Sequence, residues 1–460
     1  MLPEDFKKRM KNMLDDYDDF IKAMEKAPVS GIRINEKKPG AKEAVLDKFG
    51  ELKPVEWCGA GFYADKSVIN GKHPYHHAGL FYFQEPSAMT AAEAVRIEPD
   101  DKILDLCAAP GGKSTHAGAK LGRGGLLVAN DISAKRSAVL AENLERFGIN
   151  AVVLAEFPER LEDRLGGFFD KIIVDAPCSG EGMFRKEERA AIDWSIAHTE
   201  SCAVRQSAIL RSAAKMLAPG GYIIYSTCTF APCENEGVIS RFLNENPDFE
   251  LVHMPALDML TPGAAEYTED GRKELSECRR VFPHRNGGEG HFAACLHFNG
   301  GSPERVKIPE NAADAENAGG AVRFYREFEE KYLTVRLDGG FELFGNNLYL
   351  CDKRIGSLDR IKVIRPGLHL GEIVTSARGR TRFEPSYALA HYLEMSDIKT
   401  VVSYECDGEE IAAYLSGGEI RDDNAPDGWC AVCADGFVLG WGKASGGVVK
   451  NKYPKKLREF

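Results

Sequence analysis

The sequence predicts an α/β fold in which a doubly wound, mostly parallel sheet follows a small N-terminal α/β unit and precedes β-rich domains. Between Gly79 and Phe298, apolar strand segments alternate with helical segments, as in parallel sheets covered by helices on both faces. Within this region, Lys102 to Asp131 reads as strand, glycine-rich turn, helix and strand, an arrangement that binds nucleotide-like ligands. We expect four parts, which are residues 1–78, 79–300, 301–384 and 385–460.

Length and composition indicate a soluble protein of several domains. The chain has 460 residues, and at about 150 residues a domain this suggests roughly three. No apolar run approaches the ~18 residues of a membrane span, and the charged N-terminus lacks the pattern of a signal peptide. The twelve cysteines form no disulfide framework, so we expect reduced thiols and a cytoplasmic location. With a net charge of −11, any nucleic acid would have to be bound by local basic patches.

The first 78 residues are expected to form the N-terminal unit. Residues 1–27 read as two short amphipathic helices, and short strands follow from Gly31 to Tyr63. Three histidines, at positions 73, 76 and 77, are candidate metal ligands, but no cysteine or carboxylate spacing accompanies them. We therefore expect an exposed loop there and no metal site.

The region from 79 to 300 is expected to supply the central sheet. Its first strand is the apolar segment before Cys107, and its second ends at Asp131. Gly148 and the pair Pro219-Gly220 are expected to stop helices. The further helices are expected at Ala134–Phe147, Cys202–Leu217 and Glu234–Asn246, and the further strands at Ala151–Ala155, Lys171–Asp175, Gly221–Ser226, Phe249–His253 and Phe292–Phe298.

The turn from Cys107 to Gly112, Cys-Ala-Ala-Pro-Gly-Gly, has the features of a nucleoside-binding loop. Glycine lets backbone N–H groups approach a ligand, and the following helix directs its positive end toward negative charge. A Walker A loop would need glycine where Cys107 stands, and a dinucleotide fingerprint would need spaced glycines where Gly111 and Gly112 are adjacent. Asp131 ends the next strand about 20 residues on, where such units place the acid that accepts ribose hydroxyls. S-adenosylmethionine is the ligand that suits this pattern.

Two cysteines follow successive strands of the expected sheet. Cys178 comes three residues after Asp175, and Cys228 follows the next strand, at the edge where ligands of such sheets bind. Two thiols beside a methyl donor suggest methylation at C5 of a pyrimidine, because that carbon becomes nucleophilic only after a thiolate has added to C6. Asp175 is placed to stabilise the adduct near N3. Spacing alone does not decide which of the two cysteines forms the bond.

Five segments resemble the motifs of a known family. They are Asp105–Lys113, Asp175–Gly182 and Ser226–Thr229, with Tyr82–Ser87 upstream and Gly288–Phe292 downstream. They are similar to the motifs of the Nop/Sun RNA cytosine-5 methyltransferases, and within this family the bacterial RsmF type, which modifies small-subunit (16S) ribosomal RNA, is the most similar. The resemblance implies a class I S-adenosylmethionine-dependent methyltransferase fold.

The resemblance implies roles for the motif residues. Cys228 would attack C6 and Cys178 would assist product release, while Asp175 and Lys113 would contact the target base. The methyl donor would be held by Cys107, Ala108, Ala109, Pro110, Gly111, Gly112 and Lys113, together with Asp131, Arg136, Glu156 and Asp175.

One position departs from the family pattern. After the third strand the family often carries an aspartate that meets the adenine amine, whereas Pro158 stands in that place here. Glu156 or Glu159 is expected to substitute for it.

The C-terminal part is expected to bind RNA. Asn299–Asn317 is rich in Gly, Ala and acidic residues and reads as a connector. The final unit resembles the PUA-like domain of RsmF-type chains and ends in the basic stretch Lys450–Arg458, for which a merely solvated tail is the alternative. Cys430 and Cys433 have zinc-knuckle spacing, but without a second pair they are expected to be core thiols. Further basic residues between 352 and 384 are Lys353, Arg354, Arg360, Lys362, Arg365, Arg378, Arg380 and Arg382.

Two other functions compete with an RNA cytosine-5 methyltransferase. A catalytically silent RNA-binding assembly factor would share the fold, but retention of both cysteines, Asp175 and Lys113 argues against it. A P-loop enzyme is disfavoured by Cys107. We expect a monomer whose partner is 16S ribosomal RNA or the small ribosomal subunit, with no membrane partner.

Overall fold

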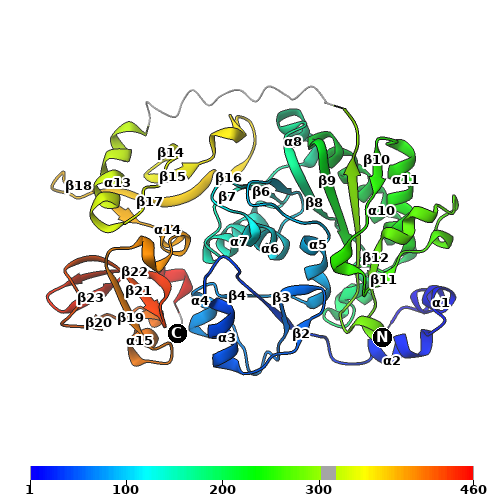
Figure 1. The fold of residues 1–460 in the computed structure, drawn as a ribbon, viewed down its shortest axis with the longest axis horizontal. Coiled ribbons are helices and arrows are strands. Elements are labelled where there is room, and N and C mark those ends of the chain that lie inside the picture. Colours follow the sequence, from blue (N-terminus) through cyan, green and yellow to red (C-terminus); the bar gives the residue numbers. More distant parts are fainter. Residues whose placement is uncertain (1, 302–317, 459–460) are drawn as a thin grey trace.

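The computed structural model describes residues 2–301 and 318–458, and a large sheet with helices on both faces lies at its centre (Figure 1). Apolar side chains fill the central strands, as expected of strands buried on both faces. The expected connector lies, from residue 302 onward, outside the described residues. The central strands are parallel, in the order β7 (Ala151–Leu154), β6 (Leu126–Asn130), β5 (Lys102–Asp105), β8 (Phe169–Asp175) and β9 (Leu217–Thr227).

Antiparallel strands extend this sheet on both sides. Beyond β9 lie β13 (His291–Phe298), β12 (Arg279–Val281) and β11 (Thr261–Pro262), and β10 (Phe249–Leu251) also pairs with β13. At the opposite edge, β16 (Val363–Arg365) pairs with β7. The predicted doubly wound α/β fold is confirmed, and these edge strands make the sheet mixed rather than mostly parallel.

Successive residues of each central strand face opposite layers of helices. In β5, Ile103 belongs to one hydrophobic core and Leu104 to another, as the two-residue period of a strand requires. Side chains of α5 (Thr90–Glu93), α6 (Gly112–Lys120) and α7 (Ala134–Arg146) contribute to the first core. The second includes α8 (Pro158–Leu165), α10 (Ile196–Met216) and α11 (Glu236–Glu245).

Two elements begin earlier than the sequence indicates. Helix α10 starts at Ile196 rather than Cys202, because the Ser195 hydroxyl accepts a hydrogen bond from the His198 N–H (3.1 Å) and caps the helix. Strand β9 starts at Leu217 rather than Gly221, since Leu217 already pairs with Phe169 of β8. As a result, α10 and β9 are both longer than expected, and they follow each other directly in the chain before Cys228.

The N-terminal unit contains its own sheet, in the order β2 (Pro54–Val55), β3 (Cys58–Tyr63), β1 (Gly31–Ile34) and β4 (Phe81–Phe83), with α3 (Ala41–Phe49) against it. Because β4 pairs with β1, this sheet continues past the boundary expected at residue 78. The three histidines do not form an exposed loop. His73 caps α4 (Pro74–His77), where its Nδ1 accepts a hydrogen bond from the Tyr75 N–H.

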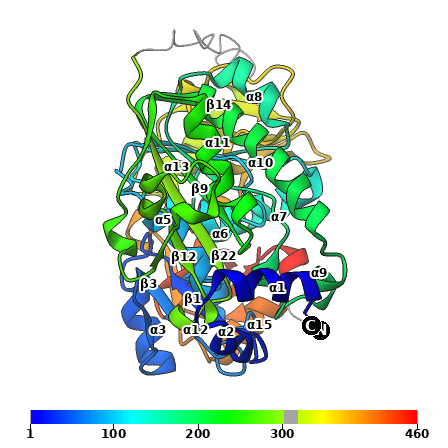
Figure 2. The ribbon, with the colours of Figure 1, turned by 90° about the vertical axis from the view of Figure 1, so that its right-hand side faces the viewer.

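The two N-terminal helices pack against the region of the large central sheet rather than against this small sheet (Figure 2). Phe6 of α1 (Glu4–Met13) and Phe20 of α2 (Tyr17–Met24) contact Phe230, two residues beyond Cys228. Arg9 of α1 forms an ion pair with the buried Glu181, in the loop that follows Cys178. The helix pair therefore braces both cysteine-bearing loops.

The C-terminal part forms two sheets that share one hydrophobic core. Helix α14 (Tyr387–Tyr392) lies between the sheets and contacts α7. The Gly148 turn after α7 comes so close to it that a Cβ there would lie 2.2 Å from the His391 carbonyl oxygen. The first sheet is β14 (Gly340–Phe344), β15 (Asn347–Cys351), β17 (Gly367–Thr375) and β18 (Thr381–Pro385), with α13 (Gly319–Tyr332) and α14 (Tyr387–Tyr392). The second is β19 (Val401–Tyr404), β21 (Gly428–Ala434), β22 (Phe437–Ser445), β23 (Val448–Asn451) and β20 (Ile420–Arg421), with α15 (Glu409–Ser416).

Candidate active site

The two cysteines lie side by side at the ends of adjacent strands. Because Asp175 of β8 is in register with Ser226 of β9, the segments that follow them leave the sheet together. The Sγ atoms of Cys178 and Cys228 are 3.2 Å apart, and both are free thiols of intermediate exposure. The geometry thus unites two residues that are 50 positions apart in the sequence.

A charged pair lies beside these thiols. Lys113 Nζ is 2.8 Å from Asp175 Oδ2, and the Ser226 hydroxyl donates to Asp175 Oδ1 at 2.9 Å. Burial alone would lower the pKa of Lys113, but the adjacent Asp175 carboxylate outweighs it and the pKa is raised. Burial likewise opposes ionisation of Asp175, and the positive charge of Lys113 turns the balance, so that its pKa is lowered. Both groups are therefore ionised.

Buried carboxylates hold the two cysteine loops in place. Glu234 accepts hydrogen bonds from the Ser179 N–H (2.9 Å) and the Gln206 side chain (2.9 Å), and Glu181 accepts one from the Phe230 N–H (3.0 Å). The N–H of Gly182 donates to the Cys228 carbonyl at 2.8 Å. A Cβ at Gly182 would lie 2.6 Å from the Gly290 carbonyl oxygen, so only glycine fits there.

The glycine-rich turn has the close-fitting geometry that a ligand loop needs. Gly111 has φ +114°, which favours glycine, and α6 begins at the next residue. The fully buried Arg33 of the N-terminal unit donates to the Gly112 carbonyl (2.7 Å) and the Thr115 hydroxyl (2.8 Å). Arg136 donates to the Ala109 carbonyl at 2.6 Å. Arg33 was not predicted from the sequence, although a lone arginine within an apolar strand indicates a buried polar role.

Two acidic residues follow the next strands. Asp131 is only 4% exposed, accepts a hydrogen bond from the Ser133 N–H (2.9 Å) and pairs with Arg136 at 3.2 Å. Glu156 is also buried, and its main chain is bonded to the side chain of Asn130 at the end of β6. Glu159 is exposed, on α8.

The glycine-rich turn and the thiol-bearing loops lie close enough for their charges to influence each other. Burial first, and then the charges of Asp105, Asp175 and Asp131, raise the pKa of Cys107 well above its usual value. The electrostatic interaction with Cys228 contributes to the raised pKa of Lys113. The structure therefore brings the predicted ligand loop, the acidic strand ends and both thiols into one region.

Asp105 is a candidate residue that the sequence motif contained but that was given no role. It is completely buried, its Oδ2 accepts a hydrogen bond from Ser114 (2.6 Å), and its Oδ1 has no hydrogen-bond partner among the described residues. Burial raises its pKa to about 7. His291, at the start of β13 and within the motif Gly288–Phe292, is buried close to Lys113 and Asp175, and no role was predicted for it.

Other groupings of reactive side chains have structural explanations. Cys58, Glu93 and His116 lie close enough to ligate a metal, but Glu93 already bonds His116 (2.9 Å) and Lys120 (2.7 Å). A second grouping, His73 with Cys406 and Asp407, is partly exposed, and Asp407 is paired with Lys48. Cys430 and Cys433 are completely buried in β21, which confirms that they are core thiols.

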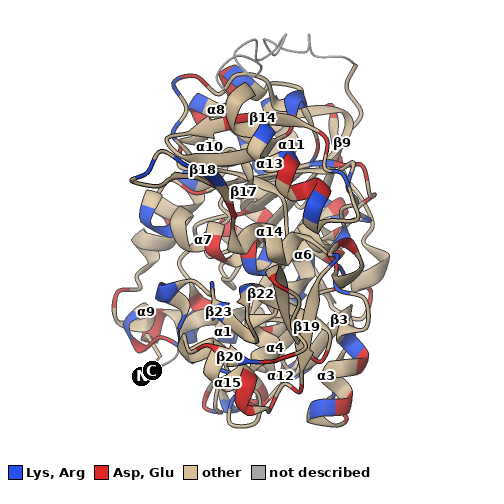
Figure 3. Cartoon of the chain, turned by 90° about the vertical axis from the view of Figure 1, so that its left-hand side faces the viewer, with Lys and Arg blue, Asp and Glu red and all other residues tan. Residues whose placement is uncertain are grey.

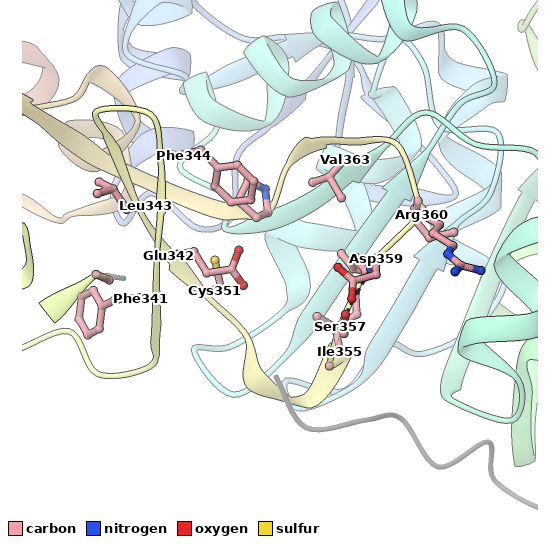
Figure 4. Close-up of a pocket in the computed structure, with 15 residues that line it drawn as sticks. Phe341, Glu342, Leu343, Phe344, Cys351, Ile355, Ser357, Asp359, Arg360 and Val363 are labelled. Atoms are coloured by element: carbon pink, nitrogen blue, oxygen red, sulfur yellow. Dashed lines mark hydrogen bonds between the residues drawn. The ribbon is translucent and has the colours of Figure 1, made fainter. Parts of the chain in front are cut away.

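The hollow shown in Figure 4 is not the candidate active site. It has a volume of about 460 Å³ and lies between the β14–β15 hairpin and the segment that leads into β16. Apolar and charged side chains both line it, among them Phe341, Phe344, Val363, Glu342 and Arg360. None of the candidate site residues lines it.

The basic C-terminal stretch is part of the folded domain. Tyr453 is 2% exposed, and Lys456 pairs with Glu142 of α7, so the stretch is folded against the rest of the chain. Its lysines Lys450, Lys452, Lys455 and Lys456 are exposed, and their contact with RNA stays a prediction. On this side of the molecule, segments of basic and acidic residues are interspersed (Figure 3). Arg378 and Arg380 are exposed in the turn between β17 and β18. Within residues 2–301 and 318–458, no helix is both long and apolar enough to cross a membrane.

Family models match four consecutive parts of the chain. They are the N-terminal domain of 16S rRNA methyltransferase RsmF at residues 2–86, 16S rRNA methyltransferase RsmB/F at 92–297, the RsmF rRNA methyltransferase first C-terminal domain at 324–393 and the methyltransferase RsmF PUA domain at 401–459. A methyltransferase homologue from Pyrococcus horikoshii has a similar structure, with a TM-score of 0.55 and 29% identity over 62% of this chain and 91% of that one.

Curated relatives match almost the whole length. Ribosomal RNA small subunit methyltransferase F of Vibrio vulnificus (strain YJ016) is 31% identical over 99% of this chain and 97% of its own. The protein of the same name from Aeromonas salmonicida (strain A449) is 31% identical over 96% of this chain and 93% of its own. The expected family and cofactor are thereby confirmed, and the chain belongs to the RsmF family of S-adenosylmethionine-dependent 16S ribosomal RNA methyltransferases.

Proposed function

We propose that the protein methylates C5 of cytosine in 16S ribosomal RNA through a covalent adduct between Cys228 and C6 of the base. The observation that carries the proposal is the 3.2 Å contact between Cys228 and Cys178 beside the Lys113–Asp175 pair. Methylation of a ring nitrogen or a ribose hydroxyl needs no thiol. Methylation at C5 requires one, because C5 gains nucleophilic character only when a thiolate has added to C6.

The reaction proceeds in four balanced steps. The Cys228 thiolate forms a bond to C6 while N3 gains a proton, for which the Lys113 ammonium is the nearby source. C5 then attacks the methyl group of S-adenosylmethionine, and S-adenosylhomocysteine leaves. A base removes the C5 proton. Finally the C6–S bond breaks, the thiolate departs, and N3 returns its proton to Lys113, which restores the aromatic ring of neutral 5-methylcytosine.

Cys178 is suited to help the thiolate leave. Its hydrogen bond with Cys228, and then its burial, raise the pKa of Cys178 well above the usual thiol value, so it keeps its proton. An S–H held 3.2 Å from the Cys228 sulfur can donate to that atom as the C6–S bond breaks. This matches the part in product release that the family resemblance implies.

The methyl donor is proposed to bind along the strand ends between the Cys107–Gly112 loop and β7. Asp131 accepts the ribose hydroxyls, Arg136 stabilises the loop through Ala109, and the loop backbone surrounds the methionine part. Glu156 is favoured over Glu159 as the partner of the adenine amine, because it is buried next to β6 whereas Glu159 is exposed. The NSun6 structure from Pyrococcus horikoshii, which shares this fold, was determined with SFG.

RNA is proposed to bind through the PUA domain and the basic turn at Arg378 and Arg380. Exposed cations contact phosphates without regard to sequence, while the strand ends select the target base. The protein is proposed to act as a monomer on ribosomal RNA or the small subunit.

Nucleoside analysis of 16S ribosomal RNA tests this proposal. RNA from cells that lack the protein is incubated with enzyme and methyl-labelled S-adenosylmethionine, and the product is digested, separated by mass and sequenced after bisulfite treatment. We expect label in 5-methylcytidine at one or a few positions, and none with Cys228→Ala. Label in a methylated ribose or in another base would refute the proposed chemistry. A Cys295→Ala variant, which changes a buried thiol in the middle of β13, controls for loss of a cysteine as such.

A further inference from the structure

His291 occupies a position beside the candidate active site that the mechanism above does not use. It begins β13, and the next residue, Phe292, pairs with Thr227, which immediately precedes Cys228. Its side chain is buried, with 4% of the residue exposed, and it interacts electrostatically with both Lys113 and Asp175. Of its polar atoms, Nε2 has no hydrogen-bond partner within the described chain.

The surroundings of His291 keep the imidazole neutral. Burial, and then the positive charge of Lys113, lower its pKa to about 3, although Asp175 and the backbone of Gly290 act in the opposite direction and Lys186 adds a further small lowering. The interaction with Gly290 raises the pKa, as a ring N–H donated to a carbonyl oxygen does. A neutral imidazole that donates from Nδ1 presents a lone pair at Nε2. The unpartnered atom is therefore a hydrogen-bond acceptor.

Close packing fixes the position of this imidazole. Gly290 has φ +141°, and a Cβ there would lie 2.3 Å from the ring of Phe230. Phe230 in turn stacks on Phe282 with ring centres 5.6 Å apart. Gly182, in the loop after Cys178, packs closely against the Gly290 carbonyl and so restricts the movement of this turn. His291 is thus presented on a rigid turn.

We infer that His291 selects cytosine over uracil by accepting a hydrogen bond at Nε2 from the 4-amino group of the target base. The inference rests on the proposed function, in which Asp175 and Lys113 meet the base near N3. The 4-amino group is attached to the ring atom next to N3, so it comes within reach of a side chain close to both residues. Uracil would instead present its O4 lone pairs to the Nε2 lone pair and leave the buried nitrogen without a partner.

The inference is tested by pairing a change in the side chain with a change in the base. RNA containing cytidine at the target position is compared with RNA carrying its pyrimidin-2-one analogue, which lacks the 4-amino group. The rate of covalent adduct formation is measured for wild type, His291→Phe and His291→Gln. Phenylalanine keeps a planar ring without an acceptor, whereas glutamine keeps an acceptor oxygen.

We expect the rate ratio of cytidine to pyrimidin-2-one to fall by about tenfold in His291→Phe, the loss corresponding to one hydrogen bond, and to recover in His291→Gln. Differences in the intrinsic reactivity of the two bases cancel, because every enzyme form meets both. His297→Phe is the matched control, since it makes the same change in the same strand, opposite Tyr222 at the far end of the pairing with β9. Its ratio should equal that of wild type.

An unchanged ratio in His291→Phe would overturn the inference, as would an equal fall in His297→Phe. If wild type forms no adduct with either RNA, the proposed chemistry fails and not the role of His291. If His291→Phe does not fold, His291→Asn provides the comparison, because its shorter side chain cannot reach the same point and should lower the ratio relative to His291→Gln. Equal ratios for the asparagine and glutamine variants and wild type would then overturn it.

Discussion

Substitutions in the pair formed by Lys113 and Asp175 should affect stability and catalysis differently. At 2.8 Å and an effective dielectric constant near 20, the attraction between the two charges is about 6 kcal/mol before desolvation is subtracted. Removal of one partner leaves the other charge buried, which typically costs about 3–5 kcal/mol. The Asp175 side chain retains 34% exposure, so water screens part of this cost and we expect about 2–3 kcal/mol.

Asp175→Asn keeps the contact with Ser226 and removes the charge, and Lys113→Met keeps the apolar part of the lysine. Each single variant should lower the temperature of thermal unfolding by about 5–10 °C, as 2–3 kcal/mol does for a domain of this size. The double variant should recover most of this loss, because neither charge remains unpaired. All three variants should lose methyl transfer, since both residues are proposed to contact the base.

Differential scanning calorimetry of wild type, the two single variants and the double variant measures the unfolding temperature. Methyl transfer to 16S ribosomal RNA measures the catalytic activity of the same four proteins. If the double variant is destabilised by the sum of the two single changes, the pair contributes no coupling energy and the reasoning is refuted. Lys171 and Asp101, which form another buried pair of the same sheet away from the thiols, offer a control. Their disruption should affect stability and leave the intrinsic methyl-transfer step intact.

Three further predictions concern the methyl donor, RNA and pH. Asp131→Ala should weaken binding of S-adenosylmethionine by about 1.5–3 kcal/mol in titration calorimetry, and unchanged affinity would remove Asp131 from the site. Neutralising Arg378 and Arg380 with glutamine should reduce the slope of log affinity for RNA against log salt by about two, and an identical slope would place the RNA elsewhere. Because burial raises the folded pKa of Asp105 to about 7, folding favours its protonated form, so its stabilising contribution is present below pH 4 and is lost as pH rises to 7. Stability curves of wild type and Asp105→Asn should therefore diverge over that window, and parallel curves would contradict the raised pKa.

The central part of the site could be predicted from sequence because strand ends obey a simple rule. Asp131, Asp175 and the two cysteines each follow an apolar segment, and parallel strands place their carboxyl ends at one edge of the sheet. The short distance between Cys178 and Cys228 follows from the neighbouring positions of β8 and β9.

Contacts between distant segments could not be predicted. β16 has only three residues and its partner β7 lies some 200 positions earlier, so no local pattern announces their pairing. Glu181 and Glu234 look like ordinary polar loop residues, and their burial depends on loops that meet only in the folded chain. The same holds for Arg33, whose partners lie in α6.

The two thiols provide the most direct test of covalent catalysis, because the mechanism gives them opposite phenotypes. Each of Cys178→Ala and Cys228→Ala is incubated with ribosomal RNA and methyl donor and run on a denaturing gel. Cys178→Ala should still attack C6 but release slowly, and should accumulate an RNA–protein complex seen as a shifted band. Cys228→Ala should give neither complex nor methylation. A complex with Cys228→Ala and none with Cys178→Ala would reverse the assignment, and no complex with either folded, RNA-binding variant would contradict the covalent mechanism.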